Sequence, residues 1–108
     1  MLLKNNIEIE VSAVFANIKK LTNQIYKLLP NREENIDWQT PLITIIEEVG
    51  GMGRLFTNHQ DIVFTLLCKL EGLLLLENED DFILYRRTIF ECLNLLSVLK
   101  GEIEACQD

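Results

Sequence analysis

Apolar residues recur at helical spacing in four separate segments of the chain. The first segment alternates steps of four and three residues through Ile7, Val11, Val14, Ile18, Leu21, Ile25 and Leu28. The last segment repeats the pattern through Phe82, Tyr85, Ile89, Cys92, Leu96, Leu99, Ile103 and Cys106. This spacing places the apolar side chains along one side of a helix. It therefore predicts two long helices that pack against others along their whole length.

Two shorter apolar segments lie between the long ones. The second segment carries Leu42, Ile45, Val49, Met52 and Phe56, and the third carries Ile62, Val63, Leu66, Leu67, Leu70, Leu73 and Leu74. The third is also apolar on its other sides, at Phe64, Cys68 and Leu75. A helix that is apolar nearly all round is typical of a buried position, so we expect the third helix to be the most buried.

Local signals predict where the helices begin and end. Pro30 should end the first helix, because proline lacks the N–H that a helix interior needs. Thr40 followed by Pro41 predicts an N-cap and the first turn of the second helix, and Trp38 should anchor the preceding loop on the bundle. With short connections, the expected fold is an all-α, single-domain, up-down-up-down four-helix bundle over residues 1–108. Its helices are expected at about 6–29, 41–57, 59–76 and 81–105.

Three glycines lie within the predicted second helix: Gly50, Gly51 and Gly53. Each lowers helix propensity by ~1 kcal/mol relative to alanine, so their presence needs a structural reason. Gly50 and Gly53 are three residues apart, a spacing that places them on the same side of a helix. We interpret them as a smooth surface for the close approach of a neighbouring helix. A kink or a hinge at these glycines is the alternative.

Composition and charge favour a protein partner. Of the 108 residues 48% are apolar, and the mean hydropathy is +0.13. A domain this small has a large surface for its volume, so we expect surface apolar residues that a second copy or another protein covers. The net charge of −7 would repel the phosphates of nucleic acid and speed the capture of a basic protein.

Other features bear on the cellular compartment. The longest purely apolar run, Leu73 to Leu76, is far too short to span a bilayer, so no membrane association is expected. The cysteines show no CxxC spacing and are interpreted as buried or half-buried thiols in a reducing cytoplasm: Cys68, Cys92 and Cys106. One histidine and dispersed cysteines give no zinc-ligand spacing. We therefore expect no catalytic residue, metal or cofactor.

The stretch from Leu42 to Gly50, which contains Glu47 and Glu48, resembles the start of the metal motif in MazG-type all-α nucleotide pyrophosphohydrolases. That family shows Glu-Glu-x-x-Glu and a later Glu-x-x-Asp, which the segment Glu77 to Asp80 would supply. The resemblance implies that these carboxylates hold magnesium against the phosphates of a nucleotide. The chain departs from the pattern at Gly51, where the third glutamate would stand, and one carboxylate fewer weakens a magnesium site.

His59 is the only histidine of the chain. Together with Arg54 it is similar to the Arg-x4-His pattern of HEPN ribonucleases, although Leu55 stands where that family usually has a polar residue. The resemblance implies RNA cleavage, for which an acidic domain is poorly suited. At the start of the third helix, His59 is otherwise interpreted as a residue at the solvent edge.

The leading hypothesis is a non-catalytic protein-binding module of the bacterial immunity or antitoxin type, which inhibits a basic toxin such as a nuclease. An acidic surface gains association rate from electrostatic steering and affinity from a few buried anchors. The expected contact residues are all acidic: Glu47, Glu48, Glu71, Glu77, Glu79, Asp80 and Asp81. Two alternatives remain open. One is a divergent MazG-like pyrophosphohydrolase, and the other is a structural subunit that forms a homodimer through its third and fourth helices.

Overall fold

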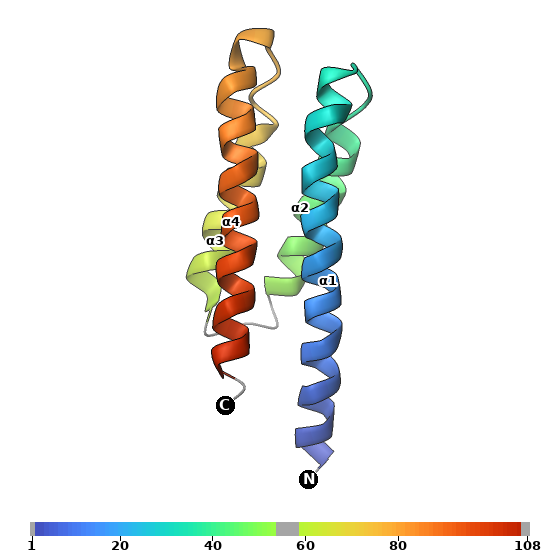
Figure 1. Ribbon diagram of the computed structural model, residues 1–108, viewed down its shortest axis with the longest axis vertical. Coiled ribbons are helices and arrows are strands. Elements are labelled where there is room, and N and C mark those ends of the chain that lie inside the picture. The colour runs from blue at the N-terminus through green and yellow to red at the C-terminus, as the bar shows by residue number, and fades with distance from the viewer. Residues whose placement is uncertain (1, 54–58, 107–108) are drawn as a thin grey trace.

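The chain folds into a bundle of antiparallel helices that run up, down, up and down (Figure 1). The computed structural model describes residues 2–53 and 59–106, and the side chains of residues 12–53 and 59–105. These ranges hold α1 (Leu2–Glu33), α2 (Gln39–Gly53), α3 (Gln60–Leu73) and α4 (Phe82–Cys106), with a short 3₁₀ turn, η2 (Glu79–Asp81), before α4. They contain no strand and no helix with the length and apolar character needed to cross a membrane. The predicted all-α four-helix bundle is confirmed.

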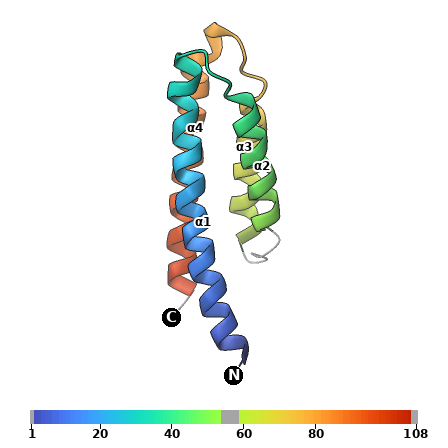
Figure 2. The same ribbon diagram turned by 90° about the vertical axis from the view of Figure 1, so that its right-hand side faces the viewer.

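Each helix packs against the next one along the chain, and α1 also packs against α4, so the four helices form a closed ring. Figure 2 shows this ring from the side, with α1 and α4 in one layer and α2 and α3 in the other. Because α1 and α4 are longer than the middle pair, their lower ends extend past α2 and α3 (Figure 1).

The predicted apolar stripes form the core. Side chains with no exposed area come from all four helices: Leu21, Ile25 and Leu28 from α1; Leu42, Ile45 and Val49 from α2; Leu66, Leu70 and Leu73 from α3; and Tyr85, Ile89, Cys92, Leu96 and Leu99 from α4. Burial of one aliphatic side chain of this size contributes about 1.5–3 kcal/mol relative to leaving it exposed. The stripes are therefore the main source of stability for the bundle.

The first helix does not end at Pro30, which lies inside its last turn. The helix continues to Glu33 and is terminated by Asn35, whose φ of 59° is left-handed. The Asn35 N–H donates to the Arg32 carbonyl at 3.2 Å, and the Ile36 N–H donates to the Asn31 carbonyl at 2.7 Å. These two bonds form a Schellman motif with asparagine in the place of the usual glycine. Because Pro30 lies in the last turn, its missing N–H costs the helix only one backbone hydrogen bond, and the last turn still forms.

The second helix begins at Gln39, two residues before the predicted start, and Thr40 is not its N-cap. The Asp37 carboxylate caps the helix instead, because its Oδ1 accepts from the N–H of Gln39 at 3.0 Å and of Thr40 at 3.2 Å. Hydrogen bonds from Thr40 and Gln39 hold the pKa of Asp37 below its usual value. Trp38 packs on the core as predicted. The predicted end of this helix at residue 57 lies outside the described residues.

The third helix is not covered on every side. Its predicted core positions are covered, but Phe64 is 68% exposed and Cys68 is also exposed. In a ring of four, every helix occupies a corner and turns one side outward. The apolar outer side of α3 therefore remains open to solvent, as does Leu75 just after the helix, which is 81% exposed.

The glycines of α2 have two different environments. A Cβ placed on Gly53 would come within 2.7 Å of Val63 Cγ1 on α3, so this glycine permits close packing of the two helices, as predicted. A Cβ on Gly50 or Gly51 would meet nothing within 4 Å. The close-approach interpretation is therefore correct for Gly53 and wrong for Gly50.

Replacing Gly51 by alanine should raise the free energy of unfolding by about 0.5–1 kcal/mol, because alanine favours the helix and the added methyl meets open space. The same change at Gly53 should gain less or destabilise the protein, because the branched side chain of Val63 would have to move. Urea unfolding followed by circular dichroism measures both variants. Equal gains at the two positions would show that the α2–α3 contact is not tight.

Candidate functional site

Two loops meet at one end of the bundle. Residues 34–38 connect α1 to α2, and residues 74–81, which include η2, connect α3 to α4. Figure 1 shows both connections at the top, and Figure 2 shows them at the same end from the side. Gln39 Nε2 donates to Glu77 Oε1 at 2.9 Å and links the two. Residues far apart in sequence therefore form one surface.

This end of the molecule is strongly acidic. It gathers four of the predicted contact residues, namely Glu77, Glu79, Asp80 and Asp81, with three carboxylates that the sequence interpretation missed, namely Glu33, Glu34 and Asp37. We call these seven residues the acidic end; they are seven of the chain's 17 acidic residues. Six are exposed and Asp81 is half-buried. The predicted up-down-up-down topology could have identified these three carboxylates. It places the α3–α4 connection at the same end of the bundle as the α1–α2 connection.

Arg32 is the only cation in the segments 30–38 and 74–82, and internal contacts engage it. Its guanidinium donates hydrogen bonds to the carbonyl oxygens of Leu76 and of Asn78, the second at 2.7 Å. The guanidinium also lies over aromatic rings, 4.2 Å from the ring centre of Tyr85 and 5.0 Å from that of Trp38. Arg32 thus ties the end of α1 to the α3–α4 connection and stacks on the rings beneath.

A depression of about 330 Å³ opens at the acidic end. Its walls combine carboxylates with aromatic side chains: Glu33, Glu77 and Glu79 with Trp38 and Phe82, together with Arg32 and Asn35. Carboxylates attract a cation, and aromatic faces accept the methylene stem or the charged head of a long basic side chain. The depression therefore has the chemistry to receive a lysine or an arginine.

The two aromatic side chains that line the depression, Trp38 and Phe82, pack against the ring of Tyr85. Tyr85 is fully buried, lies edge-on to Trp38 with ring centres 5.1 Å apart, and stacks against Phe82 at 6.4 Å. The hydroxyl of Tyr85 has no hydrogen-bond partner. Burial raises the pKa of Tyr85 to about 12, although the nearby Arg32 acts in the opposite direction. Tyr85 is therefore a neutral packing residue at physiological pH.

The other predicted contact residues lie elsewhere. Glu48 is half-buried on α2, 3.7 Å from Lys20 Nζ on α1, and Glu47 beside it is exposed. Gln39 contacts the acidic end, and Glu48 lies nine residues further along α2, which is about 13 Å of helix. Glu71 is exposed on α3. The structure therefore brings four of the seven predicted residues together at the acidic end, whereas Glu47 and Glu48 belong to α2 and Glu71 to the last turn of α3.

The distance along α2 between Glu48 and the acidic end also bears on the resemblance to the MazG-type pyrophosphohydrolases. Glu47 and Glu48 belong to the middle of α2, whereas Glu77 and Asp80 belong to the acidic end. Within the described parts of the chain, no three histidine, cysteine, aspartate or glutamate side chains are arranged to hold a metal ion. The two sequence patches that carry the resemblance do not form a joint site.

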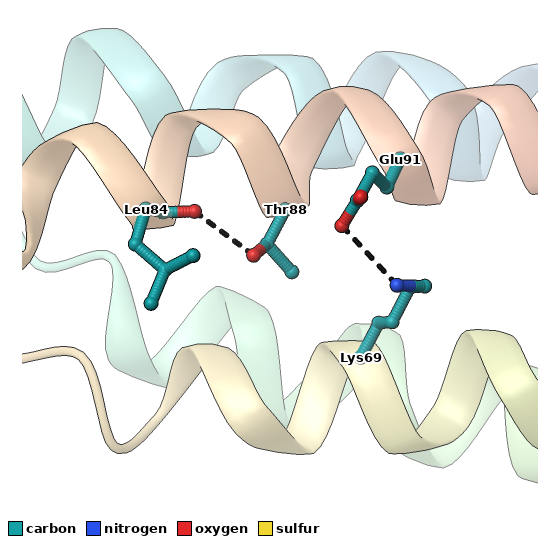
Figure 3. Close-up of polar contacts among 4 residues, drawn as sticks. All are labelled: Lys69, Leu84, Thr88 and Glu91. Atoms are coloured by element: carbon teal, nitrogen blue, oxygen red, sulfur yellow. Dashed lines mark hydrogen bonds and ion pairs between the residues drawn. The ribbon is translucent and has the colours of Figure 1, made fainter.

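A larger depression, of about 540 Å³, lies between α3 and α4. Lys69 and Glu91, which both line it, are paired, with Lys69 Nζ donating to Glu91 Oε1 at 3.2 Å (Figure 3). Nearby on α4, the Thr88 hydroxyl donates to the Leu84 carbonyl at 2.9 Å. Since Arg87 also lines this depression, its charges are of both signs. Its cations outnumber its one carboxylate, whereas three carboxylates outnumber Arg32 in the depression at the acidic end.

The described cysteines differ in environment. Cys92 is buried in the core, as predicted, and burial raises the pKa of its thiol to about 12. A thiol with this pKa is protonated at neutral pH and is a poor nucleophile. Cys68 is exposed, contrary to the prediction, and the side chain of Cys106 lies outside the described residues.

Replacing Arg32 by lysine should lower the free energy of unfolding by about 1–2 kcal/mol, because lysine cannot stack as a plane while it donates to two carbonyls. The conservative change Arg87→Lys on the exposed side of α4 is the matched control and should have little effect. Urea unfolding at pH 7 compares the two. Equal stability of both variants would show that Arg32 does not hold the connection in place.

The raised pKa of Tyr85 predicts a loss of stability at alkaline pH. Between pH 10, where a tyrosine in the unfolded chain ionises, and about 12, where Tyr85 ionises in the fold, the unfolded state loses its proton first. Stability is therefore fully present below pH 10 and falls as the pH rises through this window. Tyr85→Phe should reduce the loss, whereas the exposed Tyr26→Phe should not. Unfolding midpoints measured from pH 8 to 12 test this, and identical profiles for the two variants would contradict it.

His59 and Arg54 carry the other family resemblance. The side chain of His59 is only 12% exposed, so it is more covered than the predicted solvent-edge position, and its Nδ1 lies 3.3 Å from Glu102 Oε2 on α4. Arg54 lies outside the described residues.

Comparisons of the chain with protein-family models, with curated proteins and with solved structures found no match.

Proposed function

We propose that the chain is a non-catalytic protein-binding module that holds a basic protein at its acidic end. An immunity or antitoxin role, in which the partner is a cationic toxin such as a nuclease, fits this chemistry best. The observation that carries the proposal is the gathering of seven carboxylates at one end of the bundle, three of which line a depression whose only cation, Arg32, is engaged by internal contacts. The positive charge that would balance this end has to come from another molecule.

The acidic end would act in two steps. Its summed charge attracts a cationic surface from a distance and raises the rate of encounter. A lysine or arginine of the partner then enters the depression, which Glu77 and Glu79 line from the α3–α4 connection and Glu33 lines from the last residue of α1. A charged anchor that loses its water in a pocket lined by carboxylates and rings supplies affinity as well as rate. The nucleic-acid cleft of a nuclease presents cations of this kind, so its occupation would also block activity.

A bacterial cytoplasm suits this role. Cys68 is a free thiol on the surface, and Cys92 is a free thiol in the core. Exposed thiols of this kind remain reduced in a cytosol, whereas an oxidising compartment would favour their pairing. An inhibitor that protects its own cell from a toxin would act in that compartment.

The test is affinity capture from the native host with three baits: the unaltered chain, Glu77→Lys/Glu79→Lys, and the control Asp61→Lys/Glu104→Lys. Both double variants raise the net charge from −7 to −3, two for each substitution, but only the first alters the depression. The unaltered chain and the control should retain a basic protein that elutes as salt rises. The first variant should retain at least about tenfold less. Circular dichroism and thermal melting confirm that each bait is folded.

Equal capture by the two double variants would show that overall charge, and not the acidic end, drives binding. Recovery of acidic proteins alone would contradict a cationic partner. Either outcome would rule out the proposed function.

A further inference from the structure

The outer sides of α2 and α3 form a second surface, separate from the acidic end. On α2, Glu48 pairs with Lys20 of α1, and on α3, Lys69 pairs with Glu91 of α4. The side of α2 opposite Glu48 therefore faces α3, and the side of α3 opposite Lys69 faces α2. The close approach of Gly53 on α2 to Val63 on α3 is consistent with this arrangement. By helical spacing, these sides carry Ile43, Ile46 and Gly50 on α2 and Phe64, Leu67 and Leu74 on and just after α3. We call these six residues the α2–α3 face.

This face is apolar and open. Phe64 is 68% exposed and Ile43 is 47% exposed. Ile46, Leu67 and Leu74 pack on the core and are half-buried, so they join the exposed side chains to a rigid base. Gly50 leaves open space beside them, because a Cβ there would meet nothing within 4 Å. Exposed apolar side chains that adjoin one another on a core-packed base favour a protein contact.

The charges around the face select its occupant. Within residues 39–53 and 60–75 the only cation is Lys69, which pairs with Glu91 on the side toward α4. The exposed charges beside the apolar residues are all acidic: Glu47 on α2, and Asp61 and Glu71 on α3. A second copy placed face to face would bring acids against acids with no base to offset them. A partner with basic residues beside an apolar stripe meets no such opposition.

We infer that the α2–α3 face binds an amphipathic helix of a partner protein, with an apolar stripe on the face and lysine or arginine residues beside Glu47 and Glu71. The two helices are 15 and 14 residues long, about 21–22 Å, which is enough to seat about four turns of such a helix. Its apolar anchors would recur at helical spacing, i, i+4, i+7 and i+11, as in other helix-binding surfaces. This surface goes beyond the proposed function, because neither its residues nor its occupant depend on the acidic end.

The probe for the test is a labelled synthetic 18-residue helix with leucine along one side and lysine on the other. A peptide with glutamate in place of every lysine is the charge control. Fluorescence anisotropy at 150 mM salt measures binding to the full chain. The lysine peptide should bind and the glutamate peptide should bind at least tenfold more weakly. Phe64→Ser and Glu71→Lys should each weaken binding of the lysine peptide by about tenfold or more.

Two variants separate this face from other surfaces. Ile83→Ser removes an apolar side chain on α4 that is 76% exposed, so it matches Phe64→Ser in exposure and should leave binding unchanged. Glu77→Lys/Glu79→Lys should also leave it unchanged, since the acidic end lies elsewhere. If the acidic-end variant loses the peptide while Phe64→Ser retains it, the inference is overturned and the proposed function stands.

Three other results would overturn the inference. Equal binding of both peptides would show that charge does not select the occupant, and no binding of the lysine peptide would show that the face does not hold such a helix. Sedimentation equilibrium tests self-association directly. A dimer that Phe64→Ser dissociates and Ile83→Ser retains would make a second copy the occupant.

Discussion

The shortness of the connections is the constraint on which the rest of the structure depends. The five residues from 34 to 38 reach at most about 18 Å when fully extended. The second helix is about 22 Å long, so a parallel arrangement with α1 would need a longer connection. The second helix must therefore run back along α1, and α3 and α4 also run antiparallel to the helix before them, with their apolar stripes toward the common core. This places the first and third connections at the same end of the bundle.

The acidic end follows directly from that topology. Carboxylates about 45 residues apart in sequence come to lie at one end of the bundle, where their like charges repel. Arg32 supplies only one positive charge beside seven carboxylates, so most of this repulsion remains. The bundle tolerates the charge because its core supplies the stability. A surface on which carboxylates so outnumber the cations is well suited to a cationic partner.

The small size of the domain explains the apolar side of the α2–α3 pair. Four helices in a ring have no central position, so an all-round apolar helix such as α3 cannot be covered on every side. Phe64 and Ile43 lie outside the closed core and are therefore exposed, even though both side chains are apolar. The two surfaces differ in chemistry, since one is charged and hollowed and the other is apolar with an acidic border. A partner could contact either surface without covering the other.

The sequence by itself determined the helices and the core, because a stripe repeated every three to four residues has only one way to be buried. Leu21, Leu42, Leu66 and Tyr85 are covered as their spacing predicts. Helix ends were less predictable: Asn35 and Asp37 perform the roles expected of Pro30 and Thr40, because the choice among neighbouring polar residues depends on hydrogen bonds that form only in the folded loop. The grouping of Glu33 and Glu34 with Glu77 and Glu79, and the exposure of Phe64, were decided by tertiary structure alone. Local patterns carry no information on which distant segments will share an end of the bundle, or on which side of a helix will lack a neighbour.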